Sequence, residues 1–189
     1  MLGGVPSGDA ALAANECSPA IYRQGMIRRE GRRVATVEAM ANTYTSLHYH
    51  VVCSTKNREP FLGEAIRERV FAYLGGIVRE NGMNALEIGG VADHVHLLLS
   101  IPASLAVSKA VQLIKGGSSH WLKEAFPNMV NFAWQDGYEA FTVNQAELND
   151  VRAYIRSQPE HHRKKTFTEE YRAFLARHRI EYDERYLLG

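Results

Sequence analysis

The segment over 93–99, Asp-His-Val-His-Leu-Leu-Leu, constrains the fold of this 189-residue chain more than any other part of it. Residues two apart on a strand point to the same side of a sheet, so His94 and His96 share one face of the predicted strand. The opposite, core-facing side consists of Val95, Leu97 and Leu99. The segment therefore predicts a half-buried strand that carries two candidate metal ligands.

The rest of the chain predicts strands and helices in a specific order, from the spacing of apolar residues and from turn residues. The predicted elements are a strand over 43–53, a helix from Ile66 to the stop at Asn81-Gly82, strands over 86–91 and 95–101, a helix between Ser104 and Pro127, a strand region over 132–143, a helix over 148–162 and a last helix from Thr166. This is the order of the split βαβ arrangement in ferredoxin-like folds, followed by two helices. We expect an α+β fold with helices on one face of an antiparallel sheet and the other face open for a site or partner.

Composition divides the chain into two parts. Residues 1–40 are rich in Gly, Ala and Arg without a hydrophobic period, which predicts a disordered N-terminal extension before a single domain over 41–189. Cys17 and Cys53 lack the spacing of a zinc site, which favours a reducing compartment. Because no apolar run approaches the roughly 20 residues of a membrane span and no signal peptide is recognisable, we expect a soluble, cytoplasmic protein.

The predicted helix over 148–162 adds two polar side chains to the histidine pair. Tyr154 and Gln158 are four residues apart, so they lie on one side of that helix. If this side faces the sheet, Gln158 completes a His/His/amide ligand set with His94 and His96. Such mixed nitrogen and oxygen ligation suits Mg²⁺ or Mn²⁺ at an open site, where phosphate oxygens take the remaining positions.

These residues resemble the IS200/IS605-type transposases, the single-tyrosine branch of the HUH nucleases. The resemblance covers roughly residues 43–188 and rests on the His-hydrophobic-His motif and on the helix with Tyr154 and Gln158. Further segments similar to the family are 47–52, 54–58, 114–119 and 134–138. The stretches 134–141 and 158–163 lean toward the REP-associated tyrosine transposases. Ala92 stands where the family usually has a proline before Asp-His.

The resemblance implies DNA strand transfer. Tyr154 would attack a phosphodiester of single-stranded DNA and leave a 5′-phosphotyrosine and a free 3′-hydroxyl. Mg²⁺ or Mn²⁺ would be held by His94, His96 and Gln158. Members of the family act as homodimers on DNA hairpins, and the tyrosine helix of one subunit can serve the histidine pair of the other.

The local charge of the C-terminal region favours a nucleic-acid partner, although the net charge of the whole chain is only +1. Residues 151–165 contain five Lys or Arg residues and one Glu, a net charge of +4 before histidines are considered. Contacts of such residues with phosphates weaken steeply with salt. The candidate DNA-binding residues are Lys56, Arg58, Lys115, Arg152 and Arg163.

Two other functions fit parts of the sequence. One is a domesticated hairpin DNA-binding regulator that keeps the fold without productive cleavage. The other is a zinc hydrolase that uses a cluster of His48, His50, His94 and His96. We interpret His161 and His162 either as solvated residues near the negative end of a helix dipole or as phosphate contacts.

Overall fold

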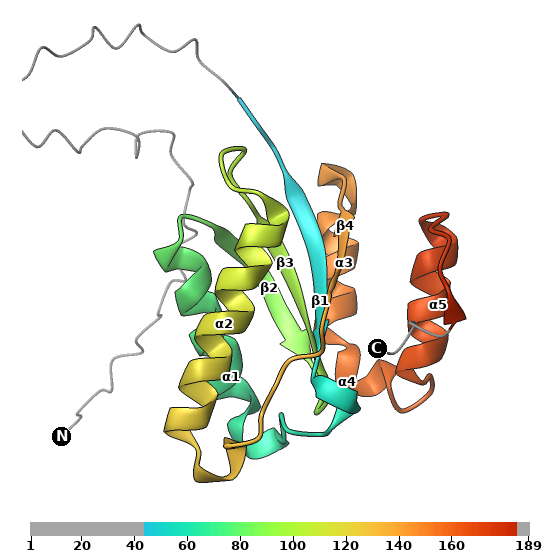
Figure 1. Ribbon diagram of the computed structural model, residues 1–189. Helices are drawn as coiled ribbons and strands as arrows, with labels where there is room; N and C mark the ends of the chain where they lie inside the picture. The colour runs from blue at the N-terminus through green and yellow to red at the C-terminus, as the bar shows by residue number, and fades with distance from the viewer. Residues whose placement is uncertain (1–43, 185–189) are drawn as a thin grey trace, which may run out of the picture. The chain divides into compact units, whose positions relative to one another are not determined.

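The computed structural model describes residues 44–184 (Figure 1). The predicted extension over 1–40 and Cys17 lie outside these residues, so the domain boundary near residue 41 stays a prediction. Cys53 is a free, buried residue of a strand, as expected for a small apolar side chain. None of the helices within 44–184 has the length and apolar character needed to cross a membrane.

Four antiparallel strands form one sheet in the order β2-β3-β1-β4. The strands are β1 (His48–Ser54), β2 (Asn84–Gly90), β3 (His94–Ser100) and β4 (Glu139–Thr142). The two central strands, β1 and β3, pair so that Val52 lies opposite His96 and His50 lies opposite Leu98. The strand order and the helix between β1 and β2 are those of the split βαβ arrangement, which confirms the predicted α+β class.

The main core lies between one face of the sheet and two long helices, α1 (Glu64–Glu80) and α2 (Val107–Ala125). Figure 1 shows these two helices together on one side of the sheet. The predicted core side of β3 is correct, because Val95, Leu97 and Leu99 are at most 1% exposed. They pack against apolar residues of both helices, including Leu74 of α1 and Ile114 of α2. Burying each such side chain contributes about 1.5–3 kcal/mol.

The second face of the sheet is covered, and our expectation of an open face was wrong for this chain. The covering helices are α3 (Leu148–Arg156), α4 (Gln158–His161) and α5 (Phe167–Arg177). Ile155 of α3 is fully buried in a smaller apolar cluster with Leu98 of β3 and Leu148. Residues 44–184 also contain short 3₁₀ helices, which are η2 (Lys56–Arg58), η3 (Pro127–Met129) and η4 (Gln145–Glu147).

The helix predicted over 148–162 is in fact two helices. α3 ends at Arg156, and Ser157 leaves helical geometry with φ −85° and ψ 5°. Pro159 lies in the first turn of α4, where its missing N–H costs nothing. In a continuous helix the same proline would lose the bond to the Ile155 carbonyl and clash with the preceding turn, so the break follows from its ring.

Two predicted strands are shorter than expected. β1 begins at His48 rather than at residue 43, and β4 contains only Glu139–Thr142 of the predicted region 132–143. Gly137 has φ 78°, a left-handed conformation that suits glycine and interrupts the region. The last helix begins as predicted, because Thr166 and Glu169 form a complete capping box.

Candidate active site

His94 and His96 lie on the face of β3 opposite the main core, under the C-terminal helices. They are 0% and 1% exposed, and their ring centroids are 5.0 Å apart. Nδ1 of His94 is 2.8 Å from Oδ1 of Asp93, and Nδ1 of His96 is 2.9 Å from Nε2 of His50. Both Nε2 atoms are buried without a hydrogen-bond partner among the described residues. Each ring is therefore oriented through Nδ1 and leaves Nε2 for another group.

Burial keeps this pair in the form that binds a metal. Desolvation lowers the pKa of His94, and the hydrogen bond with Asp93 only partly opposes this shift. Desolvation also lowers the pKa of His96, to well below its ordinary value, and the neighbouring His94 adds to the effect. Because both pKa values fall, both rings are neutral at neutral pH, which is the state of an imidazole ligand.

The structure brings Gln158 and Tyr154 to the same place, although they belong to different helices. Gln158 is fully buried beside both histidines, where it opposes the lowering of their pKa. The Tyr154 ring centroid lies 5.7 Å from that of His96, in an edge-on arrangement. Oε1 of Gln158 and the hydroxyl of Tyr154 are also buried with no partner in the described part of the chain. The four residues predicted as nucleophile and metal ligands thus share one interior site.

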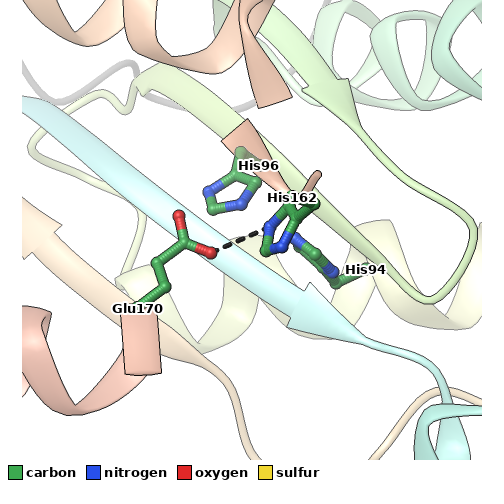
Figure 2. A group of neighbouring side chains, drawn as sticks. All are labelled: His94, His96, His162 and Glu170. Carbon is green, nitrogen blue, oxygen red and sulfur yellow. Dashed lines mark ion pairs between the residues drawn. The ribbon is translucent and has the colours of Figure 1, made fainter. Parts of the chain in front are cut away.

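Two further residues, His162 and Glu170, lie in this site, although the sequence did not single them out as ligands. One donor atom from each of His94, His96, His162 and Glu170 lies within 4.8 Å of those from the other three. Figure 2 shows the four side chains converging, with His162 Nε2 2.9 Å from Glu170 Oε2. His162, interpreted as a solvated or phosphate-contacting residue, is instead turned inward.

Glu170 had a detectable signal in the sequence. It occupies the helix face formed by Phe167, Tyr171 and Phe174, three and four residues apart, so it is an acid on an apolar stripe. Its side chain is 4% exposed, and its carboxylate accepts a hydrogen bond from Nε2 of Gln158 at 3.2 Å. Burial raises the pKa of Glu170 to about 7. Burial also lowers the pKa of His162 to about 4, and nearby His94 contributes to this shift.

The donor set fits a divalent cation. It combines imidazole nitrogens with carboxylate and amide oxygens, and several of these buried atoms lack a partner within residues 44–184. A buried polar atom without a partner costs about 1–3 kcal/mol, which a bound cation would remove. The described group excludes His48 and His50, so the four-histidine zinc cluster is not formed.

The five predicted DNA-binding residues do not form one free basic surface. Lys115 donates hydrogen bonds to the carbonyl oxygens of Gln135 and Gly137, both at 2.6 Å. Arg58 pairs with Asp93, and its guanidinium lies 3.6 Å from the ring centroid of Phe167. These two cations therefore hold loops and α5 in place.

The other three differ in their exposure. Lys56 pairs with Asp136 at 2.7 Å and keeps 42% of its side chain exposed. Arg163 pairs with Glu160 at 2.8 Å and is 76% exposed. Arg152 is partly buried. Lys56 and Arg163 are the two that present substantial charged surface to solvent.

A cavity of 430 Å³ reaches the tyrosine from outside the metal-ligand cluster. Its lining includes His50 of β1, Phe141 of β4, Tyr154 of α3, and Phe174 and His178 from α5 and its end. The Phe174 ring lies 5.8 Å from that of Tyr154 and 5.4 Å from that of His50. The hydroxyl of Tyr154 is nevertheless buried, and Phe174 of α5 packs beside its ring.

Comparison with known proteins places this arrangement in a family. The model of the family described as "Transposase IS200 like" matches residues 43–158. The transposase for insertion sequence element IS200 of Salmonella typhimurium is 34% identical over 131 residues, which cover 65% of this chain and 84% of the relative. The ISDra2 transposase TnpA of Deinococcus radiodurans is 28% identical over 117 residues, which cover 59% and 84%.

One solved structure agrees with this family. A crystal structure of a candidate transposase from Deinococcus radiodurans R1 has a TM-score of 0.51 and 25% identity, and covers 62% of this chain and 95% of the other. A REP-associated tyrosine transposase bound to a REP hairpin has a TM-score of 0.49 and 16% identity, too weak a likeness to assign that branch. Because the family match spans more than half of the chain and ends on Gln158, this chain belongs to the IS200-like transposases.

Proposed function

We propose that this transposase cleaves and rejoins single-stranded DNA through a 5′-phosphotyrosine intermediate, with Tyr154 as the nucleophile. One observation carries the proposal: the phenol of Tyr154 lies beside a buried pair of neutral imidazoles, within a chain of the IS200-like family. A phenol is the only hydroxyl in this cluster of site residues, which otherwise consists of imidazole, amide and carboxylate groups.

The proposed reaction exchanges one ester for another. The phenolic oxygen of Tyr154 forms a bond to the phosphorus, the bond from phosphorus to the 3′-oxygen breaks, and the phenolic proton ends on the released 3′-hydroxyl. Attack by a 3′-hydroxyl reverses the step and frees Tyr154, so no external energy source is needed. A tyrosine with a pKa near 10 is a weak nucleophile, so the site must stabilise the charge that develops on the phosphate.

Mg²⁺ or Mn²⁺ is the proposed cofactor, held by His94, His96 and Gln158. When bound, it would supply positive charge that polarises and orients the scissile phosphate. The protein residues do the remainder: Asp93 and His50 hold the imidazoles in orientation through Nδ1, and the apolar contacts of Ile155 hold α3 on the sheet.

The proposed substrate is a single-stranded DNA end that carries a hairpin, bound by a homodimer. The exposed cations Lys56 and Arg163 favour a polyanionic partner, and Arg152 and the other basic residues over 151–165 add to the positive charge near the tyrosine. Binding through such contacts should weaken as salt rises.

The test uses a labelled hairpin oligonucleotide library incubated with the protein and Mg²⁺ or Mn²⁺. The wild type should form covalent protein–DNA adducts, and Tyr154→Phe should form none, because the substitution removes the attacking oxygen. Tyr73→Phe is the control, since Tyr73 stacks on Trp121 in the helical layer on the other side of the sheet. Adducts that persist in Tyr154→Phe would refute the role of Tyr154.

The burial of the site also favours a second candidate, a domesticated hairpin-binding regulator. In this conformation α5 covers the tyrosine, and a DNA strand has no access to its hydroxyl. A regulator would bind hairpins tightly and give no adduct with any divalent metal. The same oligonucleotide experiment, with binding and adducts measured together, separates the two functions.

A further inference from the structure

We propose that His162 and Glu170 complete, with His94 and His96, a four-ligand transition-metal site that fastens the C-terminal helix over the active site. The inference rests on the proposed function only in taking His94 and His96 as ligands. Both additional residues lie beyond residue 158, where the match to the family ends. They come from the turn after α4 and from α5.

The three imidazoles are oriented alike. His94 Nδ1 lies 2.8 Å from the Asp93 carboxylate, His96 Nδ1 lies 2.9 Å from His50, and His162 Nδ1 lies 3.1 Å from the carbonyl oxygen of Lys165. A carbonyl oxygen only accepts hydrogen bonds, so Nδ1 of His162 carries a proton. In the neutral ring, Nε2 then carries a lone pair that can bind a metal. Histidine ligands of metals show this pattern, in which the second nitrogen is tied to a supporting group.

The side chains of His162 and Glu170 meet at the same place as the histidine pair. Nε2 of His162 lies 2.9 Å from Oε2 of Glu170. A cation bound between these two atoms would also be within reach of the Nε2 atoms of His94 and His96, which are buried without a hydrogen-bond partner among the described residues. Gln158 holds the other carboxylate oxygen of Glu170 by a hydrogen bond, which fixes Oε2 in its inward position.

The donor set selects the class of metal. Three imidazoles and one carboxylate suit Zn²⁺, Co²⁺ or Mn²⁺, whereas Mg²⁺ prefers oxygen ligands and keeps several waters. The resting protein should therefore hold a transition metal more tightly than Mg²⁺.

Metal ligation by Glu170 would also fix the cover of the site. On the same helix, Phe174 packs against Tyr154 and Phe167 packs against His94, with ring centroids 5.8 Å and 4.9 Å apart. A ligand in the middle of α5 therefore joins this cover to β3. If α5 moves away to admit DNA, Gln158, which belongs to α4, would still lie beside the histidine pair as the amide ligand of the proposed reaction.

The test titrates Zn²⁺ and Co²⁺ into metal-stripped full-length protein, measuring affinity by calorimetry and coordination by the visible absorption of Co²⁺. Wild type should bind one equivalent, and Glu170→Gln and His162→Asn should each lose more than about 100-fold in affinity, the upper end of what loss of a supporting outer group costs. Their Co²⁺ absorption should weaken as water replaces a protein ligand. His120→Asn, at a side chain that is 77% exposed, is the control.

The variants are chosen so that folding does not obscure the result. Glu170→Gln keeps an oxygen that accepts from Gln158, and the melting temperature of each metal-free variant shows whether the domain is intact. Wild-type affinity and absorption in both variants would overturn the proposal and leave His162 and Glu170 as an ion pair.

The two proposals fail separately. Tyr154→Phe should bind the metal like wild type while forming no DNA adduct. If the wild type forms no adducts but its metal affinity depends on His162 and Glu170, the proposed function fails and this inference stands. If adducts form and metal affinity does not depend on His162 or Glu170, the proposed function stands and this inference fails.

Discussion

At the scale of single residues, Asp93 connects the histidine pair to α5. One carboxylate oxygen contacts Nδ1 of His94 and the other pairs with Arg58, whose guanidinium lies over Phe167. Burial alone would raise the pKa of Asp93, but the hydrogen bond with His94 and the charge of Arg58 hold it below its ordinary value. Asp93 therefore stays ionised and fixes both the ring of His94 and the start of α5.

Glu139, at the start of β4, predicts a specific dependence of stability on pH. Burial raises its pKa to about 8, against the opposing effect of a hydrogen bond from Tyr171. The folded state therefore binds a proton that the unfolded state has lost between about pH 4.5 and pH 8, so this residue lowers the free energy of unfolding as pH rises through that window. Between pH 5 and pH 9, the free energy of unfolding of Glu139→Gln should rise by about 4 kcal/mol relative to that of wild type.

Chemical denaturation of both proteins at several pH values measures this difference, and contributions from other groups cancel because the two chains share them. Glu124→Gln, at an exposed side chain of α2, should show no such trend. A constant difference between Glu139→Gln and wild type across pH would show that Glu139 is ionised throughout.

At the scale of elements, the close approach of β2 to α3 holds the tyrosine helix on the sheet. A Cβ atom at Gly89 would lie 2.7 Å from the carbonyl oxygen of Ile155 and 2.8 Å from its Cγ2 atom. Gly89→Ala should therefore push α3 outward, lower the free energy of unfolding by about 1–3 kcal/mol, and slow adduct formation by Tyr154.

Urea denaturation and the adduct assay together test this prediction. Gly116→Ala in α2 is the matched control, because its added Cβ would have no described atom within 4 Å apart from its chain neighbours and the backbone of its own helix. That variant should be neutral or more stable by up to about 1 kcal/mol, since alanine favours a helix. Equal stability and adduct rates for Gly89→Ala and wild type would show that α3 tolerates displacement.

The sequence predicted those elements whose signals are local. Alternation identified the core side of β3, and the spacing of Thr166 and Glu169 located the start of α5. The apolar stripe over 148–155 concealed the break at Ser157, because the effect of Pro159 was outweighed by the periodicity before it. The position of α5 over the site depends on packing between distant segments, which no local pattern encodes.

The same distinction applies to the site. His94 and His96 could be paired from strand periodicity. Tyr154 and Gln158 were placed beside them from a single helix that the structure divides into α3 and α4, and the roles of all four residues stay predictions. His162 and Glu170 could not be placed there, because their approach depends on the fold of the whole C-terminal region. An acid on the apolar stripe of α5 was the available signal.

At the scale of the whole molecule, the main hydrophobic core and the candidate active site lie on opposite faces of the sheet. The large core with α1 and α2 lies on one face, and the histidine pair with α3, α4 and α5 lies on the other. Residues of the C-terminal layer can therefore move or change without exposing the main core. A cover that opens for DNA fits this division.

The position of Tyr154 beside the histidines of its own chain has a kinetic consequence. A site completed within one chain cleaves with a rate per molecule that is independent of protein concentration, whether or not the protein dimerises. We expect adduct formation with saturating hairpin DNA to scale linearly with enzyme on dilution, and a mixture of Tyr154→Phe with His96→Asn to stay inactive. Recovery of activity in that mixture would mean that subunits exchange their tyrosine helices, so that cleavage becomes a property of the pair and vanishes when the pair dissociates.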